Sequence, residues 1–322
     1  MKARRAGAAL AMLASTCTRG DSTRAEPEVG TKTRDTSLAM EPSHAARSEQ
    51  RTVPFEWRPP EGDPEAYAMP ESADRHQLVM TRGVEAGGRY PVVIAMHGQP
   101  KRGQNPRDYA FARKVIGVAA DLVQRGEVRP LVLALPVFRY RGANWPAFDL
   151  VAFRAKIEEL LREQGHEATG FYVIGHSGAA GCGGDGMNRA HRIEPAAVGF
   201  FDTCLGAGWR DEVRALARAH VPTLLIQSVE TAGVVPRQPR EYSATFDFGR
   251  IFEAVGLAPV PCTKHLPAAP LRSLDLRCAA NAQGTTRGYV VDTGDGEPAH
   301  EAALPVAFAY FLREYLSARS SE

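Results

Sequence analysis

The chain has 322 residues, of which 44% are hydrophobic and 24% are charged, and its formal net charge is +2 at pH 7. This length and apolar content allow a substantial core, in one large domain or two small ones. Lys2, Arg4 and Arg5 carry the positive excess, because the rest of the chain has 36 basic against 37 acidic residues. That balance gives no electrostatic basis for binding nucleic acid, and no apolar run approaches the roughly 20 residues of a membrane-spanning helix.

The first 17 residues predict an export signal. After the positive start comes a short apolar stretch, 6–15, and then small residues that lead to Cys17. Residues 13–17, LASTC, resemble a bacterial lipoprotein signal, in which the cysteine is lipidated and becomes the new N-terminus. We therefore expect a protein of the bacterial cell envelope, lipid-anchored or periplasmic, or a secreted one. Contact with a membrane would then go through Cys17 alone; the alternative is an ordinary signal peptide cleaved nearby.

Residues 18–50 are rich in Arg, Glu, Thr, Ser and Pro and have almost no large apolar side chains. Such a segment cannot bury enough surface to offset the entropy of ordering, so we expect a disordered tether. The globular domain is expected to cover residues 51–322.

Strand-like and helix-like segments alternate through this domain. The expected strands are 53–57, 77–82, 90–96, 131–136, 171–174, 196–201, 222–229 and 289–291. The expected helices are 108–125, 150–163, 211–219 and 302–318. This alternation predicts an α/β fold, with a mostly parallel sheet and helices on both faces.

Residues 231–288 break the alternation. They contain six prolines and only one helical segment, near 246–255. We expect a small irregular cap, inserted between the last strands above the carboxyl edge of the sheet, where ligands bind in such folds.

The turn around Ser177 is the most informative feature of the chain. An apolar run at 171–174 stops at the sequence GHSGA, residues 175–179. Glycines allow a tight strand-to-helix turn that leaves the serine hydroxyl exposed above a sheet. A serine presented in this way is typically a nucleophile.

Four features now resemble the α/β-hydrolase superfamily, over roughly residues 77–318. They are His97-Gly98 after a buried strand, the turn at 175–179, an acid at Glu230 after a later strand, and His300 before the last helix. Serine, acid and histidine follow one another in the order that this fold uses. The resemblance implies a serine hydrolase of the carboxylesterase or lipase type, which cleaves an ester through an acyl-enzyme; amide or peptide bonds are open to the same machinery. It implies no cofactor.

Ser177 is expected to be the nucleophile and His300 the general base that takes its proton. His265, in the expected cap, is the rival base. Glu230 is the expected acid that orients the imidazole, and Asp202, after the preceding strand, is the alternative acid.

Two backbone N–H groups, those of Gln99 and Gly178, are expected to form the oxyanion hole. We expect His97 to hydrogen-bond its own loop and His176 to pack against a neighbouring strand. The turn at 175–179 departs from the GxSxG motif of such nucleophiles at its last position, Ala179, where glycine is usual. The glycine-rich residues 181–186 predict that the helix after Ser177 is short or distorted.

Four cysteines remain besides Cys17, and an even number in an exported protein predicts disulfides. We expect the pairs Cys182–Cys204 and Cys262–Cys278. The chain has no CxxC motif and no Cys/His spacing typical of a metal site.

Three aromatic residues, Tyr140, Trp145 and Phe148, follow the strand at 131–136. They either line a pocket for a small-molecule or acyl substrate or anchor their loop. The competing functional class is a non-catalytic binding protein that retains the fold.

Overall fold

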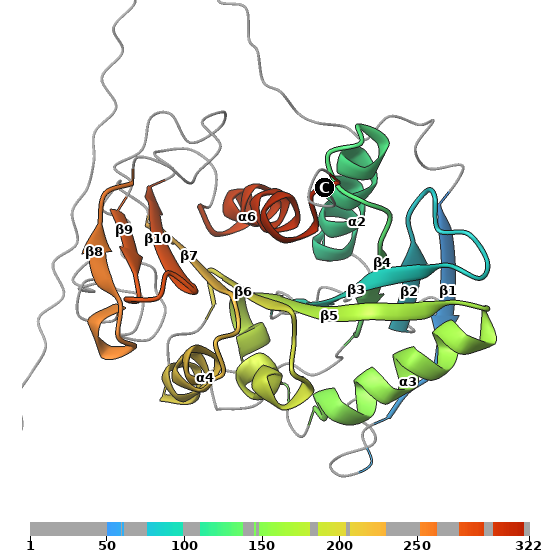
Figure 1. Cartoon of the computed structure of the whole chain (residues 1–322), viewed down its shortest axis with the longest axis horizontal. Helices are drawn as coiled ribbons and strands as arrows, with labels where there is room; N and C mark the ends of the chain where they lie inside the picture. The colour runs from blue at the N-terminus through green and yellow to red at the C-terminus, as the bar shows by residue number, and fades with distance from the viewer. Residues whose placement is uncertain are drawn as a thin grey trace, which may run out of the picture. The chain divides into compact units, whose positions relative to one another are not determined.

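The computed structural model describes one compact unit within residues 41–322 (Figure 1). The described residues are 50–58, 60, 76–98, 110–137, 145, 148–180, 186–203, 207–229, 252–262, 277–292 and 299–318. The predicted signal and all but the last residue of the predicted tether therefore lie outside the described residues. None of the described helices is both long and apolar enough to cross a membrane.

The centre of the unit is a ten-stranded sheet with the order β1-β2-β4-β3-β5-β6-β7-β10-β9-β8. Its strands are β1 (Arg51–Phe55), β2 (His76–Met80), β3 (Arg89–Met96), β4 (Val132–Leu135), β5 (Glu167–His176), β6 (Ala197–Phe201), β7 (Thr223–Val229), β8 (Ala258–Val260), β9 (Arg277–Ala280) and β10 (Thr286–Asp292). The six central strands, from β4 to β10, are parallel, and the two strands at each edge pair antiparallel. This confirms the predicted fold class, an α/β-hydrolase fold with a mostly parallel sheet.

Helices cover both faces of the sheet (Figure 1). One face carries α2 (Phe111–Gln124) and α6 (Ala299–Leu316); the other carries α3 (Leu150–Glu163) and α4 (Ala207–Arg218). Neighbouring residues of a strand point to opposite faces, so Val92 packs toward α3 while Val93 packs toward α2. Both are fully buried, which explains why the central strands are continuous apolar runs.

Local signals explain how well the helix boundaries were predicted. Helix α3 has the predicted bounds because Asp149 caps it: the Asp149 carboxylate accepts hydrogen bonds from the N–H groups of Val151 and Ala152, at 2.9 and 3.1 Å. Helix α2 begins at Phe111, three residues after the predicted start, and no side chain caps it. Without a capping residue, periodicity alone locates a helix end only loosely.

The segment expected to be irregular contributes two strands. Strand β9 pairs with β10, and β8 pairs with β9, so they extend the sheet at its edge. The expectation was wrong for these residues, because an edge strand tolerates a proline, here Pro259 of β8. Of the predicted helical segment, residues 252–255 are described; 252–254 are helical and Val255 lies in a turn. Residues 231–251 and 263–276 of the expected cap lie outside the described residues.

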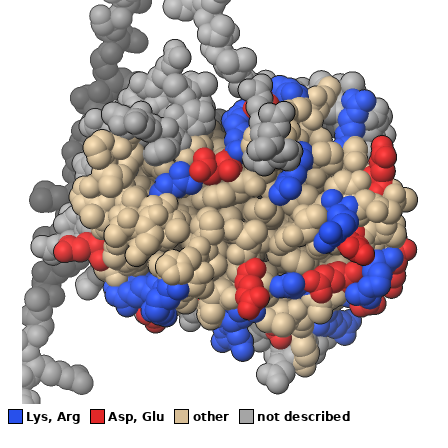
Figure 2. Space-filling model, in the orientation of Figure 1, with Lys and Arg blue, Asp and Glu red and all other residues tan. Residues whose placement is uncertain are grey.

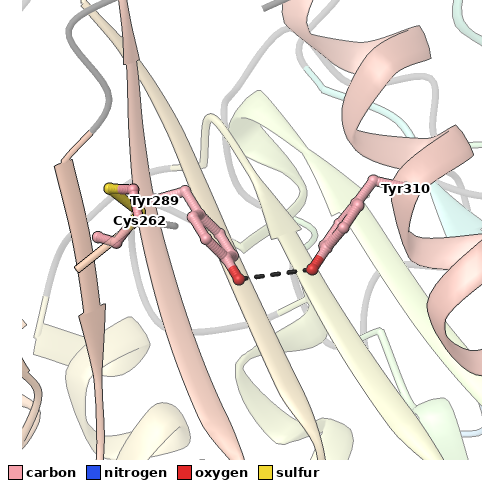
Figure 3. Close-up of a disulfide and its surroundings, with 4 residues drawn as sticks. Cys262, Tyr289 and Tyr310 are labelled. Atoms are coloured by element: carbon pink, nitrogen blue, oxygen red, sulfur yellow. Dashed lines mark hydrogen bonds between the residues drawn. A yellow bond between two sulfur atoms is a disulfide. The ribbon is translucent and has the colours of Figure 1, made fainter. Parts of the chain in front are cut away.

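A disulfide ties this added hairpin together. Cys262 and Cys278 are bonded, with their Cα atoms 5.3 Å apart, as predicted. Figure 3 shows the bond beside Tyr289 of β10, whose hydroxyl lies 3.4 Å from that of Tyr310 on α6. The disulfide, β10 and α6 are therefore neighbours. The other predicted pair, Cys182–Cys204, lies outside the described residues.

The surface of the described residues carries both signs of charge. On the face in Figure 2, Lys and Arg side chains are interspersed with Asp and Glu. Among the described residues, oppositely charged side chains four residues apart are paired: Arg125 with Asp121 at 2.7 Å, and Arg154 with Glu158 at 2.9 Å. Such exposed pairs add little stability.

Candidate active site

Ser177 lies at the end of β5, the strand between β3 and β6 in the sheet. Its backbone φ is +56°, in the left-handed region that residues with a side chain rarely adopt. Strands on both sides hold β5 by backbone hydrogen bonds, so the sheet supports this strained turn. Ser177 is only half-buried, whereas His176 before it is fully buried. The hydroxyl is thus presented at the carboxyl edge of the sheet, as the motif predicts.

Close packing around the turn explains two of its glycines. A Cβ atom on Gly175 would lie 2.8 Å from the Cβ of Ala179, so only glycine fits opposite the alanine. The departure from the motif at Ala179 is thereby accommodated. A Cβ on Gly98 would lie 2.9 Å from Ser177 Oγ and 3.0 Å from the carbonyl oxygen of His176. The backbone of the turn after β3 therefore passes directly beside the serine hydroxyl.

No regular α-helix follows Ser177 among the described residues up to Ile193. The chain forms two 3₁₀ segments instead, Ser177–Ala180 and Gly186–Ile193, and the second is kinked at Arg189. This confirms the prediction of a short or distorted helix. Gly186 has φ of +67° and packs against the carbonyl oxygen of Ala179.

His97 has the structural role that was predicted. Its Nδ1 lies 2.6 Å from the carbonyl oxygen of Gly98, and its ring is 5% exposed. Burial lowers the pKa of His97 to about 4, so the ring is neutral at neutral pH. Because a carbonyl oxygen only accepts, Nδ1 must carry the proton and donate it.

Asp202 occupies a position equivalent to that of Ser177 on the next strand. His176, the last residue of β5, pairs with Phe201, the last residue of β6. Ser177 and Asp202 are therefore the next residues along these two neighbouring strands. Asp202 is 4% exposed, has φ of +51°, and donates its N–H to the carbonyl of Ile226 at 2.7 Å. Two adjacent strands thus both end in a left-handed residue at the same edge. Glu230 lies outside the described residues, one position beyond the end of β7.

His300 is the second residue of α6, and the direction of this helix shows where it lies. The far end of α6 is tied to the residues just before β4, because the Arg129 N–H donates to the Leu316 carbonyl at 3.1 Å. That tie is at the amino edge of the sheet. Since α6 is 18 residues long, about 27 Å, its first turn lies toward the opposite, carboxyl edge. His300 and Ser177 are therefore at the same edge.

Of the other predicted residues, His176 and Gly178 are described, whereas two others are not. His176 is fully buried, as its expected packing role requires, but it stacks on Phe111 of helix α2, with ring centroids 6.3 Å apart. Gly178 is buried behind the serine. Gln99 and the rival base His265 lie outside the described residues.

Two of the three aromatic residues after β4 anchor their loop. Trp145 and Phe148 are 2% and 1% exposed, with ring centroids 5.1 Å apart, and Phe148 packs in turn on Trp57. Of the two interpretations, loop anchoring is therefore confirmed for this pair. Tyr140 lies outside the described residues. The described residues contain no group of three or more His, Cys, Asp or Glu placed to hold a metal ion.

Comparison with protein-family models and with curated proteins finds no match. Similar solved structures include a feruloyl esterase module from Clostridium thermocellum, a mutant complexed with sinapinate. The two chains are 13% identical, with a TM-score of 0.48, over 81% of this chain and 88% of that one. A siderophore hydrolase from Aspergillus nidulans is 9% identical, with a TM-score of 0.46, over 82% of this chain and 96% of that one. These scores are low, so the fold class rests on the strand order and connections described above.

Proposed function

We propose that the protein is a serine hydrolase that cleaves an ester bond through an acyl-enzyme, with Ser177 as the nucleophile. The observation that carries the proposal is the strained backbone of Ser177 at the end of a central strand, with Gly98 directly beside its hydroxyl. Strain of this kind persists where the surroundings enforce it, and it is concentrated at functional sites.

The proposed reaction has two halves. His300 takes the proton of Ser177 while Oγ attacks the acyl carbon, and the N–H groups of Gly178 and Gln99 stabilise the oxyanion. The tetrahedral intermediate then expels the alcohol, which receives the proton from His300, and leaves an acyl group on Ser177. Water, deprotonated by His300, attacks this acyl-enzyme and releases the acid in the same manner. The same steps would cleave an amide.

Glu230 and Asp202 both remain candidates for the acid that orients the imidazole. Glu230 has the position after β7 that the family resemblance implies. The burial of Asp202 and its place beside Ser177 at the sheet edge favour the alternative. His265 likewise remains the rival of His300 as the base.

We further propose that the protein is exported and acts on a small-molecule or acyl substrate. The Cys262–Cys278 disulfide fits an oxidising compartment outside the cytoplasm. Lipidation of Cys17 would add a membrane anchor.

Hydrolysis of p-nitrophenyl acetate, butyrate and octanoate by the wild type and by Ser177→Ala tests this proposal. We expect the wild type to hydrolyse at least one ester and the variant to lose a factor of about 10³ or more in kcat, because the nucleophile is removed. Unchanged thermal unfolding of the variant would show that the fold is intact. No hydrolysis of any ester by the wild type, or retained activity in a folded variant, would favour a non-catalytic binding protein.

A further inference from the structure

Trp145 lies between the two turns that meet at Ser177. Its indole Nε1 donates a hydrogen bond to the carbonyl oxygen of His97, at 3.2 Å, in the turn after β3. Its Cβ lies 3.3 Å from where a Cβ on Gly186 would be, and Gly186 packs on the Ala179 carbonyl in the turn after β5. One side chain therefore contacts the turn after β3 directly and reaches the turn after β5 through Gly186.

The turn after β3 is held at two successive peptide groups. Trp145 binds the carbonyl of His97, and the His97 ring binds the carbonyl of Gly98 at 2.6 Å. In a planar trans peptide the N–H points away from the carbonyl of the same unit. A carbonyl held on one side therefore turns the N–H of that peptide to the other side. The two hydrogen bonds together set which way the N–H groups of this turn point.

The two rings also support each other. The centroids of His97 and Trp145 are 4.9 Å apart, and both rings are buried. Trp145 in turn packs on Phe148, which contacts Trp57 and Phe153. Buried rings with few alternative rotamers hold a neighbouring group more rigidly than an exposed side chain does.

We propose that Trp145 is a positioning residue, whose indole N–H holds the turn at His97 and Gly98 in the orientation that the oxyanion hole requires. This inference rests on the proposed function. It differs from a packing role in one respect: the N–H group is needed, as well as the bulk of the ring. A misaligned donor weakens stabilisation of the transition state more than it weakens substrate binding.

The test compares Trp145→Phe with Trp209→Phe. Trp209 is a matched control because it is also buried, at 1% exposed, while its indole N–H has no hydrogen-bond partner among the described residues. Both changes remove one indole N–H and a similar volume. For Trp145→Phe we expect kcat/KM for a p-nitrophenyl ester to fall about tenfold, with Trp209→Phe within about twofold of the wild type.

The inhibition constant of phenylboronic acid gives a second measurement. Boronic acids form a tetrahedral adduct with a nucleophilic serine, and one oxygen of the adduct occupies the oxyanion hole. Trp145→Phe should raise this constant by about the same factor by which it lowers kcat/KM. Loss of activity with an unchanged inhibition constant would mean that part of the sample is unfolded, and would overturn the proposal. Equal effects of the two tryptophan variants would overturn it too.

A second pair of variants keeps the inference testable if Trp145→Phe folds poorly. His97→Asn retains a donor near the position of Nδ1, whereas His97→Leu does not. We expect the asparagine variant to keep more activity and tighter boronate binding than the leucine variant. If the two were equally impaired, the hydrogen bonds of this turn would have no positioning role. An inactive wild type would instead refute the proposed function itself, and this outcome is distinct from the others.

Discussion

The carboxyl edge of the sheet has two halves that differ in how they are built. At β3 and β5, buried short-range contacts define the site: Gly98 lies against Ser177, and Trp145 holds the carbonyl of His97. At β7 and β10, the groups proposed to complete the triad depend on segments far apart in the chain. Here Glu230 follows β7, whereas His300 is the second residue of α6, which comes after three further strands and a disulfide.

The difference shows which parts of a catalytic site a sequence encodes locally. The nucleophile and the oxyanion donors need particular backbone conformations, and short motifs rich in glycine supply these. An acid or a base needs only to reach the site from some loop. Its position therefore depends on tertiary structure.

The largest expected effect in the second half of the site concerns the base. His300→Ala should lower kcat by a factor of about 10³ or more, close to the effect of Ser177→Ala, because the members of a triad act as a unit. His265→Ala is the matched control and should stay near the wild type. Steady-state hydrolysis of a p-nitrophenyl ester measures both. The opposite ranking would place the base in the segment between β8 and β9.

The acid should have a smaller effect, because an imidazole still accepts a proton when it is poorly oriented. We expect the replacement of the true acid by alanine to lower kcat by a factor of about 10² to 10⁴. Glu230→Ala and Asp202→Ala should be measured side by side, with their unfolding curves. If Glu230→Ala is impaired and Asp202→Ala is near the wild type, the acid follows β7. The reverse result in folded variants would place it after β6, next to the nucleophile.

The smallest expected effect concerns how the free energy of unfolding depends on pH, through the buried His76 and His97. Burial lowers the pKa values of His76 and His97 to about 4, with mutual repulsion adding to the shift of His76. His76 accepts the Val137 N–H at Nδ1, 3.0 Å away, so protonation would also break that bond. The unfolded chain, with histidine pKa values near 6.5, binds protons first as the pH falls. The free energy of unfolding should thus fall between pH 6.5 and 4, by roughly 3 kcal/mol for each histidine.

Urea unfolding at pH 7.5 and 4.5 measures this dependence. A His76→Gln variant should lose less stability between the two pH values than the wild type does. The control is His220→Asn, because His220 is exposed and its replacement should leave the difference unchanged. An equal loss in all three proteins would show that the buried histidines do not control acid unfolding.

The fold could be predicted from the sequence where local signals agree. The apolar spacing of residues 150–163 located α3, and the apolar run before Ser177 located the end of β5. Strands β8 and β9 were missed, because β9 becomes a strand only by pairing with β10, and the short β8, which contains Pro259, only by pairing with β9. The hydrogen bond of Trp145 had no sequence signal, since an indole N–H can donate to any carbonyl that the fold brings near.

The central claim, that Ser177 is an activated nucleophile, is tested most directly by covalent labelling. The wild-type protein is incubated with a fluorophosphonate, digested and mapped by mass spectrometry, with Ser177→Ala as the control. We predict a single phosphonyl group on the peptide that contains Ser177 and none in the variant, because only an activated serine attacks such a reagent rapidly. An unlabelled wild type, or a label on another serine, would contradict the claim.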